Sequence, residues 1–267
     1  MIRQPAVAGQ FYPGDEKSLK KELERYIVRE TKKERALGVL APHAGYMYSG
    51  AVAGAVYSRV EIPQTVVILC PNHTGLGARA AIMLEGTWIV PGTRIPIYTP
   101  LAKEIMENSR ELDEDSMAHL REHSLEVHLP FLFYLNPGLR FVPICLMGSD
   151  FSLCEDVGNA VARALQKREE KALIVASSDM THYESHKAAQ EKDKKAIDKV
   201  LALDPKGLLD TVRRQNISMC GVIPATAMLV AVRELGAQRA ELVKYATSGE
   251  VSGDYDQVVG YAGIFVS

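Results

Sequence analysis

The chain lacks a strong charge of either sign and has no long apolar run. Its 267 residues carry 31 Lys and Arg against 33 Asp and Glu, which leaves a net charge of −2. A near-neutral chain gives no electrostatic reason to expect a nucleic-acid or membrane-surface partner. No apolar stretch approaches the ~18 residues that suggest a membrane span, and the start, Met1 to Pro5, lacks the apolar region of a signal peptide. We therefore expect a cytoplasmic protein with no nucleic-acid or membrane partner.

Cysteine is scarce, and no two cysteines form a CxxC pair. The four cysteines are widely scattered, at Cys70, Cys145, Cys154 and Cys220. In a reducing compartment such residues are thiols rather than a disulfide framework. Low-complexity linkers are also missing, and the 47% hydrophobic and 24% charged composition is that of an ordinary globular protein. We predict a single domain, residues 1–267.

Two apolar runs end in the same arrangement of proline, histidine and glycine. Residues 36–40 lead into Ala41-Pro42-His43-Ala44-Gly45, and residues 65–69 lead into Cys70-Pro71-Asn72-His73-Thr74-Gly75. Short aliphatic runs closed by Pro and Gly are typical of buried strands that end in a turn. Either histidine by itself could simply cap a turn. The repeated context instead favours paired metal ligands, because ligands bind at the carboxyl ends of strands in open α/β sheets.

Strand and helix patterns alternate along the rest of the chain. Strands are expected at residues 80–84, 88–90, 141–146, 172–176, 242–246 and 258–266, and helices at 15–31, 50–60, 100–109, 153–168, 187–203, 205–214 and 221–235. Residues 93–100 contain two prolines and suggest an edge segment or loop, while residues 111–115 and 249–256 suggest polar loops. This alternation predicts an α/β fold with a mostly buried central sheet and helices on both faces.

A third ligand is offered by Cys220, which is expected just before a helix N-terminus. The partial positive charge there favours thiolate, the form that binds metals, although an isolated cysteine is more often an inert buried thiol. Two imidazoles and one thiolate would leave an open coordination position. This donor set suits Fe(II), Cu(I) or Zn(II) and does not choose between them.

Two polar residues follow the apolar run 172–176. Asp179 could orient a ligand or hold a water, or could instead be the N-cap of a following helix. His182 could transfer a proton to a substrate, because the ordinary pKa of histidine is near ~6.5. We therefore assign Asp179 and His182 as candidate catalytic residues.

The stretch from His119 to His128 contains three histidines and two glutamates. On a helix, His119, His123 and Glu126 would share one face. The stretch is not HExxH, so a structural role, or a role in supporting the metal ligands, is preferred to direct ligation. We expect Phe11, Tyr46, Tyr48, His123 and Glu126 to line the pocket or to support its ligands.

Six ordered motifs together resemble the Memo family. They are AVAGQFYPG, APHAGYMYSG, CPNHTG, EHSLEVHLPF, SSDMTHY and SMCG, and they span almost the entire chain. Memo proteins resemble LigB-type class III extradiol dioxygenases, which hold non-haem Fe(II) with two His and a carboxylate. The resemblance implies that the metal ligands are His43, His73 and Cys220, with Asp179 and His182 beside them. Cys220 stands where the dioxygenases use the carboxylate.

The resemblance implies two kinds of function. One is metal-dependent redox chemistry on a small substrate, with iron or copper favoured and zinc as a further option. The other is a non-catalytic pocket for an anionic or phosphorylated peptide, because an animal member of the family binds phosphotyrosine-bearing receptor segments. The family also implies an AMMECR1-like protein and a radical SAM protein as partners.

Overall fold

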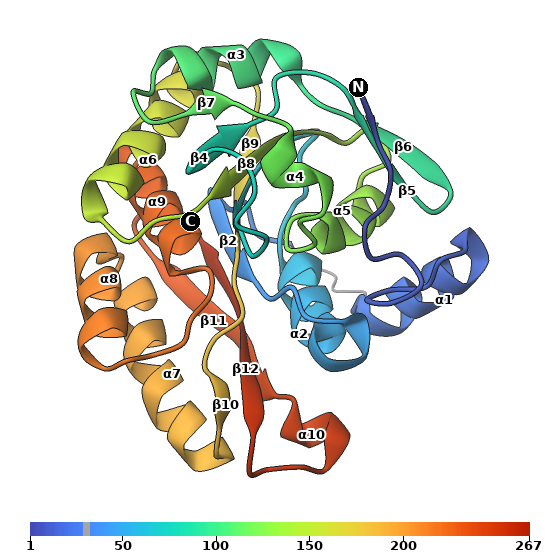
Figure 1. Cartoon of the computed structure of the whole chain (residues 1–267), viewed down its shortest axis with the longest axis vertical. Helices are drawn as coiled ribbons and strands as arrows, with labels where there is room; N and C mark the ends of the chain where they lie inside the picture. The colour runs from blue at the N-terminus through green and yellow to red at the C-terminus, as the bar shows by residue number, and fades with distance from the viewer. Residues whose placement is uncertain (29–32) are drawn as a thin grey trace.

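A central mixed sheet organises the chain in the computed structural model (Figure 1), which describes residues 1–28 and 33–267. In these residues nine strands form the sheet. Their order is β10 (His182–Glu184), β12 (Val258–Val266), β2 (Gly38–Ala41), β9 (Ala172–Ser177), β3 (Thr65–Pro71), β8 (Arg140–Leu146), β4 (Ala80–Ile82) and β7 (Asp113–Glu114), with β11 (Ala240–Thr247) also paired to β12. The strands β2, β9, β3 and β8 are mutually parallel.

The central strands are buried on both faces, as parallel strands covered by helices must be. Every residue of β2 and β3 is buried. Their Val, Ile and Leu side chains lie in one continuous apolar core. The predicted α/β fold with a mostly buried sheet is therefore confirmed.

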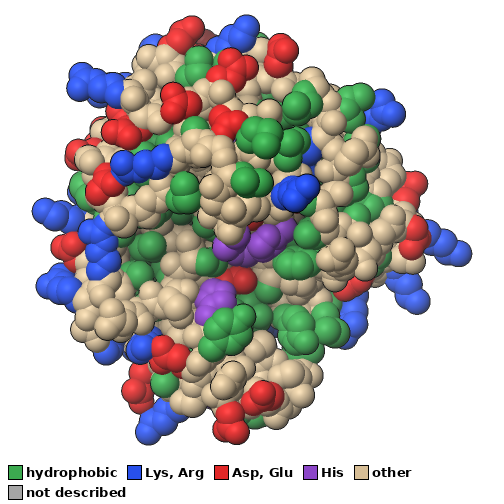
Figure 2. Space-filling model, in the orientation of Figure 1, with side chains coloured by type: hydrophobic (Ala, Val, Ile, Leu, Met, Phe, Trp, Pro, Cys, Tyr) green, Lys and Arg blue, Asp and Glu red, His purple; other side chains and the backbone are tan. Residues whose placement is uncertain are grey.

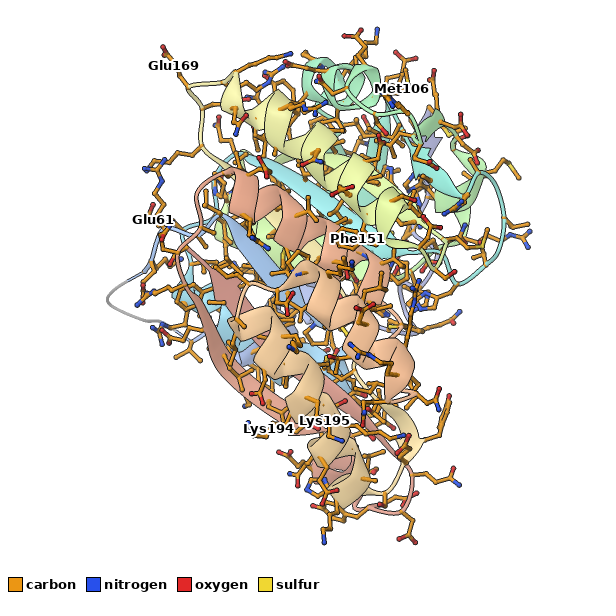
Figure 3. The ribbon with its side chains drawn as sticks, turned by 90° about the vertical axis from the view of Figure 1, so that its left-hand side faces the viewer. Glu61, Met106, Phe151, Glu169, Lys194 and Lys195 are labelled. Atoms are coloured by element: carbon orange, nitrogen blue, oxygen red, sulfur yellow. The ribbon has the colours of Figure 1, made fainter. Side chains whose placement is uncertain are left out.

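Helices cover both faces of the sheet. On one side α2 (Tyr46–Arg59) packs on β2, β11 and β12, and α1 (Glu16–Tyr26) and α5 (Leu129–Leu135) pack beside it. On the other side α9 (Val222–Glu234) packs on β2, β3 and β9, next to α6 (Phe151–Gln166) and α8 (Pro205–Arg214). Figure 3 views this second layer, with Phe151 at the start of α6 and Lys194 and Lys195 on α7 (His186–Leu201).

A second, small sheet lies at the edge of the molecule. Its strands are β1 (Ile2–Arg3), β5 (Thr87–Val90) and β6 (Thr93–Pro96), in that order. The remaining elements are α3 (Thr99–Glu107), α4 (Met117–Leu120), the 3₁₀ turn η1 (Glu126–His128) and α10 (Gly249–Ser252). No helix in the described ranges combines the length and the apolar character needed to cross a bilayer.

Several predicted boundaries differ from the structure. The helix expected over residues 15–31 ends at Tyr26, because Ile27 is extended, and positions 29–32 lie outside the described residues. The helix expected from Gly50 begins at Tyr46. Residues 93–100, expected as an edge segment or loop, contain β6, which is the edge strand of the small sheet, and also the start of α3. The polar loop expected over residues 249–256 contains α10.

The glycines of α2 serve helix packing rather than packing on the sheet. A Cβ at Gly54 would lie 2.4 Å from the carbonyl oxygen of Tyr26, at the end of α1. Only a residue without a side chain allows this approach. The small residues of α2 therefore let α1 close over it.

Candidate metal centre

Parallel strands deliver His43 and His73 to the same edge of the sheet. β9 lies between β2 and β3, with Ala176 in register with both Leu40 and Leu69. The carboxyl ends of β2 and β3 therefore flank that of β9, and the two histidines follow directly. Their ring centroids are 5.1 Å apart. Figure 2 shows histidine side chains gathered in a hollow near the middle of the face.

Glu122 holds His73 with two hydrogen bonds. Its carboxylate accepts the His73 backbone N–H at 2.6 Å, and its Oε1 lies 2.9 Å from His73 Nδ1. Because a carboxylate only accepts, Nδ1 donates to it, and in the neutral imidazole this leaves the lone pair on Nε2. Burial alone would raise the pKa of Glu122, but the hydrogen bond and charge of His73, with hydrogen bonds from Ser124, lower it to about 2. Glu122 is therefore an anion that orients an imidazole for a metal.

His123 completes a compact group of three imidazoles. One ring nitrogen from each of His43, His73 and His123 lies within 4.8 Å of the other two. The His123 ring stacks on that of His73 with a centroid distance of 4.8 Å and also contacts Phe11. Burial lowers the pKa values of His43 and His123, which keeps both imidazoles neutral. Neutral imidazole suits zinc, copper and iron, so the donor set fits a metal ion without selecting one.

Cys220 lies against His43, at the place where α9 is about to begin. Its Sγ is 3.3 Å from His43 Nε2 and also 3.3 Å from the Asp179 amide nitrogen, which donates to it. The predicted thiolate is wrong for the metal-free protein. Burial raises the pKa of the Cys220 thiol, and the nearby Asp179 raises it further, which outweighs the helix N-terminus. A bound metal would reverse this balance, because coordination removes the thiol proton.

The segment after β9 brings Asp179 and His182 to the same region. Asp179 is not a helix N-cap: its Oδ1 accepts the His43 backbone N–H at 2.8 Å, and α7 is instead capped by Ser185. Burial raises the pKa of Asp179 to about 6, against the lowering effect of that hydrogen bond. His182 Nδ1 lies 2.9 Å from the carbonyl oxygen of Ser218, so Nδ1 donates, and in the neutral imidazole Nε2 is the acceptor.

The other predicted pocket residues separate into two groups. Phe11 and His123 lie at the imidazole group, and Tyr48 is half-buried beside Val52 and Tyr261. Tyr46 is instead a core residue whose hydroxyl donates to the Val127 carbonyl.

Glu126 bonds to the N-terminal segment. Its carboxylate accepts hydrogen bonds from Arg3, the Ala6 and Val7 amides and the Tyr12 hydroxyl. These four hydrogen bonds occupy the lone pairs of the carboxylate. Glu126 therefore holds the N-terminal segment in place and does not orient a metal-ligating histidine.

The predicted common helix face of His119, His123 and Glu126 is wrong. α4 ends at Leu120, and a non-helical stretch precedes η1. His119 consequently lies in the core beside Trp88, apart from the imidazole group. Sequence reasoning missed Glu122, although its position directly before a histidine was a usable signal.

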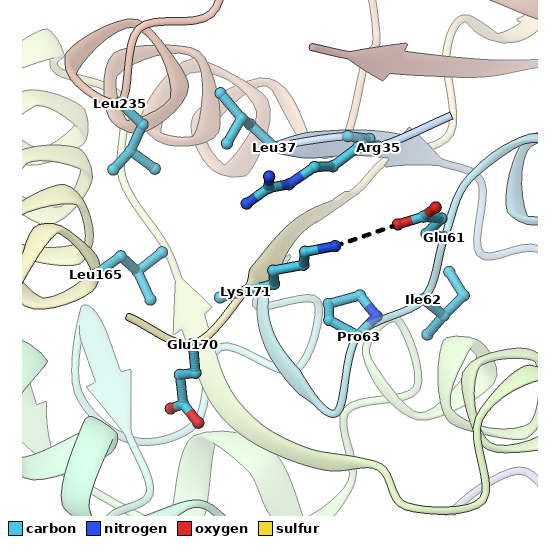
Figure 4. A pocket seen from close by; sticks show the side chains of 11 residues that line it. Arg35, Leu37, Glu61, Ile62, Pro63, Leu165, Glu170, Lys171 and Leu235 are labelled. Atoms are coloured by element: carbon cyan, nitrogen blue, oxygen red, sulfur yellow. Dashed lines mark ion pairs between the residues drawn. The ribbon is translucent and has the colours of Figure 1, made fainter. Parts of the chain in front are cut away.

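A cavity that does not involve these residues lies at the opposite edge of the sheet. It measures about 320 Å³ and is lined by residues preceding β2, β3 and β9, among them Leu37, Pro63 and Lys171 (Figure 4). Lys171 pairs there with Glu61 at 3.7 Å. Its lining contains no histidine or cysteine, and the one cluster of potential metal ligands found among the described residues is that of His43, His73 and His123.

Comparison with known proteins identifies the family of the chain. The profile of the family described as "Memo-like protein" matches residues 3–265. A MEMO1 family protein from Methanopyrus kandleri is 45% identical, covering 99% of this chain and 98% of its own length. One from Methanothermobacter thermautotrophicus is 42% identical, covering 98% and 99%, and one from Pyrobaculum aerophilum is 40% identical, covering 98% of each.

A solved structure shares the fold at much lower identity. The crystal structure of an uncharacterized Escherichia coli K12 protein matches with a TM-score of 0.51 and 14% identity, covering 85% of this chain and 99% of that one. The family profile and the relatives span almost all of the sequence that carries the histidines, the buried glutamate and the cysteine. The chain therefore belongs to the Memo family.

Proposed function

We propose that the protein binds a transition-metal ion through His43, His73 and Cys220 and uses it in redox chemistry on a small substrate. One observation carries the proposal. The Nδ1 atoms of His43 and His73 face protein partners, which leaves both Nε2 atoms for a shared ion, and the Cys220 sulfur lies 3.3 Å from one of them. Two imidazoles and a thiolate suit Cu(I), Fe(II) and Zn(II) alike, and the family resemblance favours iron or copper. Such a metal, when bound, supplies one-electron transfer and Lewis acidity.

His123 competes with Cys220 for the third position. Its imidazole belongs to the compact group, whereas Cys220 approaches His43 from the α9 side. A buried thiol is a poor ligand until it is deprotonated, but a divalent metal supplies that driving force. We place Cys220 in the coordination sphere and His123 beside it, where its stacking on His73 restricts the ring.

Two further side chains are suited to moving protons. The carboxyl group of Asp179 has a pKa raised to about 6, so it exchanges a proton near neutral pH. His182 keeps Nδ1 on a carbonyl oxygen, so in the neutral imidazole Nε2 can accept a proton from a substrate. We assign both to proton transfer at a substrate held next to the metal.

Elemental analysis of protein purified anaerobically without added metal tests the proposal. We expect close to one iron or copper per chain, lost in His43→Ala, His73→Ala and Cys220→Ser. His186→Ala is the matched control, because His186 bonds to Thr247 and belongs to a different part of the surface. Normal metal content in all three site variants would refute the proposal.

Cobalt substitution distinguishes the two third ligands. Cobalt(II) bound by a thiolate shows an intense near-ultraviolet charge-transfer band, which Cys220→Ser would remove and His123→Ala would keep. The opposite pattern would assign the ion to the three histidines. If the protein holds no metal and the metal-free form binds a phosphotyrosine peptide, the non-catalytic binding function replaces the redox one.

A further inference from the structure

The hydroxyl group of Ser177 is the centre of a buried hydrogen-bond network next to the group of three imidazoles. Its Oγ lies 2.7 Å from His43 Nδ1, 2.9 Å from His128 Nε2 and 2.6 Å from the Ser124 carbonyl oxygen. Ser177, His128 and Ser124 are all buried. These three partners together determine the direction in which the hydroxyl proton points.

The number of available protons fixes which group donates in each hydrogen bond. A carbonyl oxygen only accepts, so the short contact to Ser124 requires the single Ser177 proton. Ser177 then has only lone pairs left for the two histidines. Both His43 Nδ1 and His128 Nε2 must therefore donate to it.

The hydrogen bond between His128 and Tyr57, on the far side of Ser177 from His43, is consistent with this assignment. Burial lowers the pKa of His128 to about 3, so its imidazole is neutral and carries one proton, on Nε2. Its Nδ1 is therefore an acceptor, and the Tyr57 hydroxyl, 2.9 Å away, donates to it. Every polar atom of Tyr57, His128 and Ser177 then has a compatible partner, as a buried network requires.

We propose that Ser177 is a positioning residue that locks the tautomer of His43, so that Nε2 is bare and faces the metal. The proposal rests on the proposed function for its metal, but the tautomer is a property of the metal-free protein. Ser124 supplies the acceptor that orients the Ser177 proton, and His128 with Tyr57 occupies the remaining lone pair.

The lock matters because the opposite tautomer has partners of its own. With its proton on Nε2, His43 would face the Cys220 sulfur at 3.3 Å and the Asp179 carboxylate at 4.0 Å. The sulfur is close enough to accept a hydrogen bond and the carboxylate would attract the proton, so that arrangement would direct a proton into the coordination position. Ser177 favours the other tautomer by giving Nδ1–H an acceptor that is already oriented.

Histidine ring nitrogen shifts in the metal-free protein test the tautomer directly. Long-range ¹H–¹⁵N correlation spectra of protein labelled in its seven histidines should show His43 protonated at Nδ1, with the resonance identified by its loss in His43→Asn. Ser177→Ala should shift His43 toward the Nε2–H tautomer. Ser58→Ala is the matched control, because Ser58 is an equally buried serine that bonds only to backbone groups. A wild-type His43 protonated at Nε2 would overturn the proposal.

Metal titration supplies the second measurement. Ser177→Ala should bind Zn(II) about 10–100-fold more weakly, the usual cost of losing a partner that orients a ligand, while Ser58→Ala binds normally. Wild-type affinity together with an unchanged tautomer in Ser177→Ala would overturn the proposal even if wild-type spectra agree. A wild-type protein that shows the predicted tautomer but binds no metal would refute the proposed function and leave the tautomer assignment standing.

Discussion

The ability of each histidine of the candidate centre to bind a metal depends on which of its ring nitrogens carries the proton. His73 turns Nδ1 toward the Glu122 carboxylate, whereas His43 turns Nδ1 toward the neutral Ser177 hydroxyl. An anionic acceptor increases the basicity of an imidazole ligand more than a neutral one does. The two ligands therefore both bond to the protein through Nδ1 but differ in electron-donating strength.

Glu122→Gln tests the anionic partner. The glutamine amide has one oxygen for three donors, the His73 amide, His73 Nδ1 and the Ser124 amide, and its own NH₂ group would face one of them. We expect about 10–100-fold weaker Zn(II) binding, measured by competition with a chromophoric chelator. Glu114→Gln, an exposed change on β7, should bind as the wild type does. Equal affinities for the two variants would show that Glu122 does not support the centre.

At the level of elements, the segment after β9 is fixed from two helices. Buried Asp193 on α7 accepts the backbone amide and the hydroxyl of Thr181. From α9, the Gly221 amide donates to the Ser178 hydroxyl at 3.0 Å. The positions of Asp179 and Cys220 are therefore set by helix packing as well as by the strand end.

Gly221→Ala tests the contact between the start of α9 and the segment after β9. A Cβ at Gly221 would lie 2.1 Å from the Ser177 carbonyl oxygen and 2.4 Å from Ser178 Cβ, so α9 must shift and carry Cys220 with it. We expect a loss of about 1–3 kcal/mol in unfolding free energy, typical of overpacking, measured by urea denaturation. Gly45→Ala is the control, because its Cβ would meet nothing closer than 3.7 Å. If both variants unfold at the same urea concentration, this contact is looser than the structure indicates.

For the whole molecule, burial of polar and charged groups is concentrated around the site and the N-terminal segment. Arg3 is buried with Glu126 at 2.6 Å and lies over Trp88, which joins the small sheet to the stretch that carries Glu122 and His123. Breaking such a pair leaves an uncompensated buried charge. The N-terminus therefore belongs to the framework of the site.

Acid should destabilise the protein through its buried histidines. Burial lowers the pKa of His128 to about 3 and that of His119 to about 4, so the folded state stays neutral where the unfolded state takes up protons below about 6.5. Stability is then lost as the pH falls from about 6.5 toward 4. Asp179 and Asp193, whose pKa values are raised by burial, oppose the loss.

We expect a net decrease of at least about 2 kcal/mol between pH 7 and pH 4.5, because one pKa unit corresponds to about 1.4 kcal/mol. Urea denaturation over a pH series measures it in metal-free protein. His128→Asn should flatten the curve, whereas the surface change His186→Asn should leave it unchanged. A pH-independent midpoint would contradict the prediction.

The sequence alone determined the sheet, most of its strands and the pair of histidines at its carboxyl edge. Apolar runs that end in Pro-x-x-Gly or Pro-x-His are local signals, and the parallel arrangement of the strands brings their ends together. The helix boundaries near Tyr26 and Tyr46 were misplaced because tertiary contacts, such as that of Gly54 with Tyr26, decide where α1 and α2 meet.

Only the tertiary structure decided what surrounds those histidines. Glu122 reaches His73, and Ser177 reaches both His43 and His128, across more than 40 residues of the chain, and no local pattern encodes such pairings. Burial also decided the protonation state of the Cys220 thiol, because it raises the pKa that the helix N-terminus by itself would lower. The physical reason is that strand and helix periodicity is a property of neighbouring residues, whereas desolvation and hydrogen-bond partners depend on the packing of the whole chain.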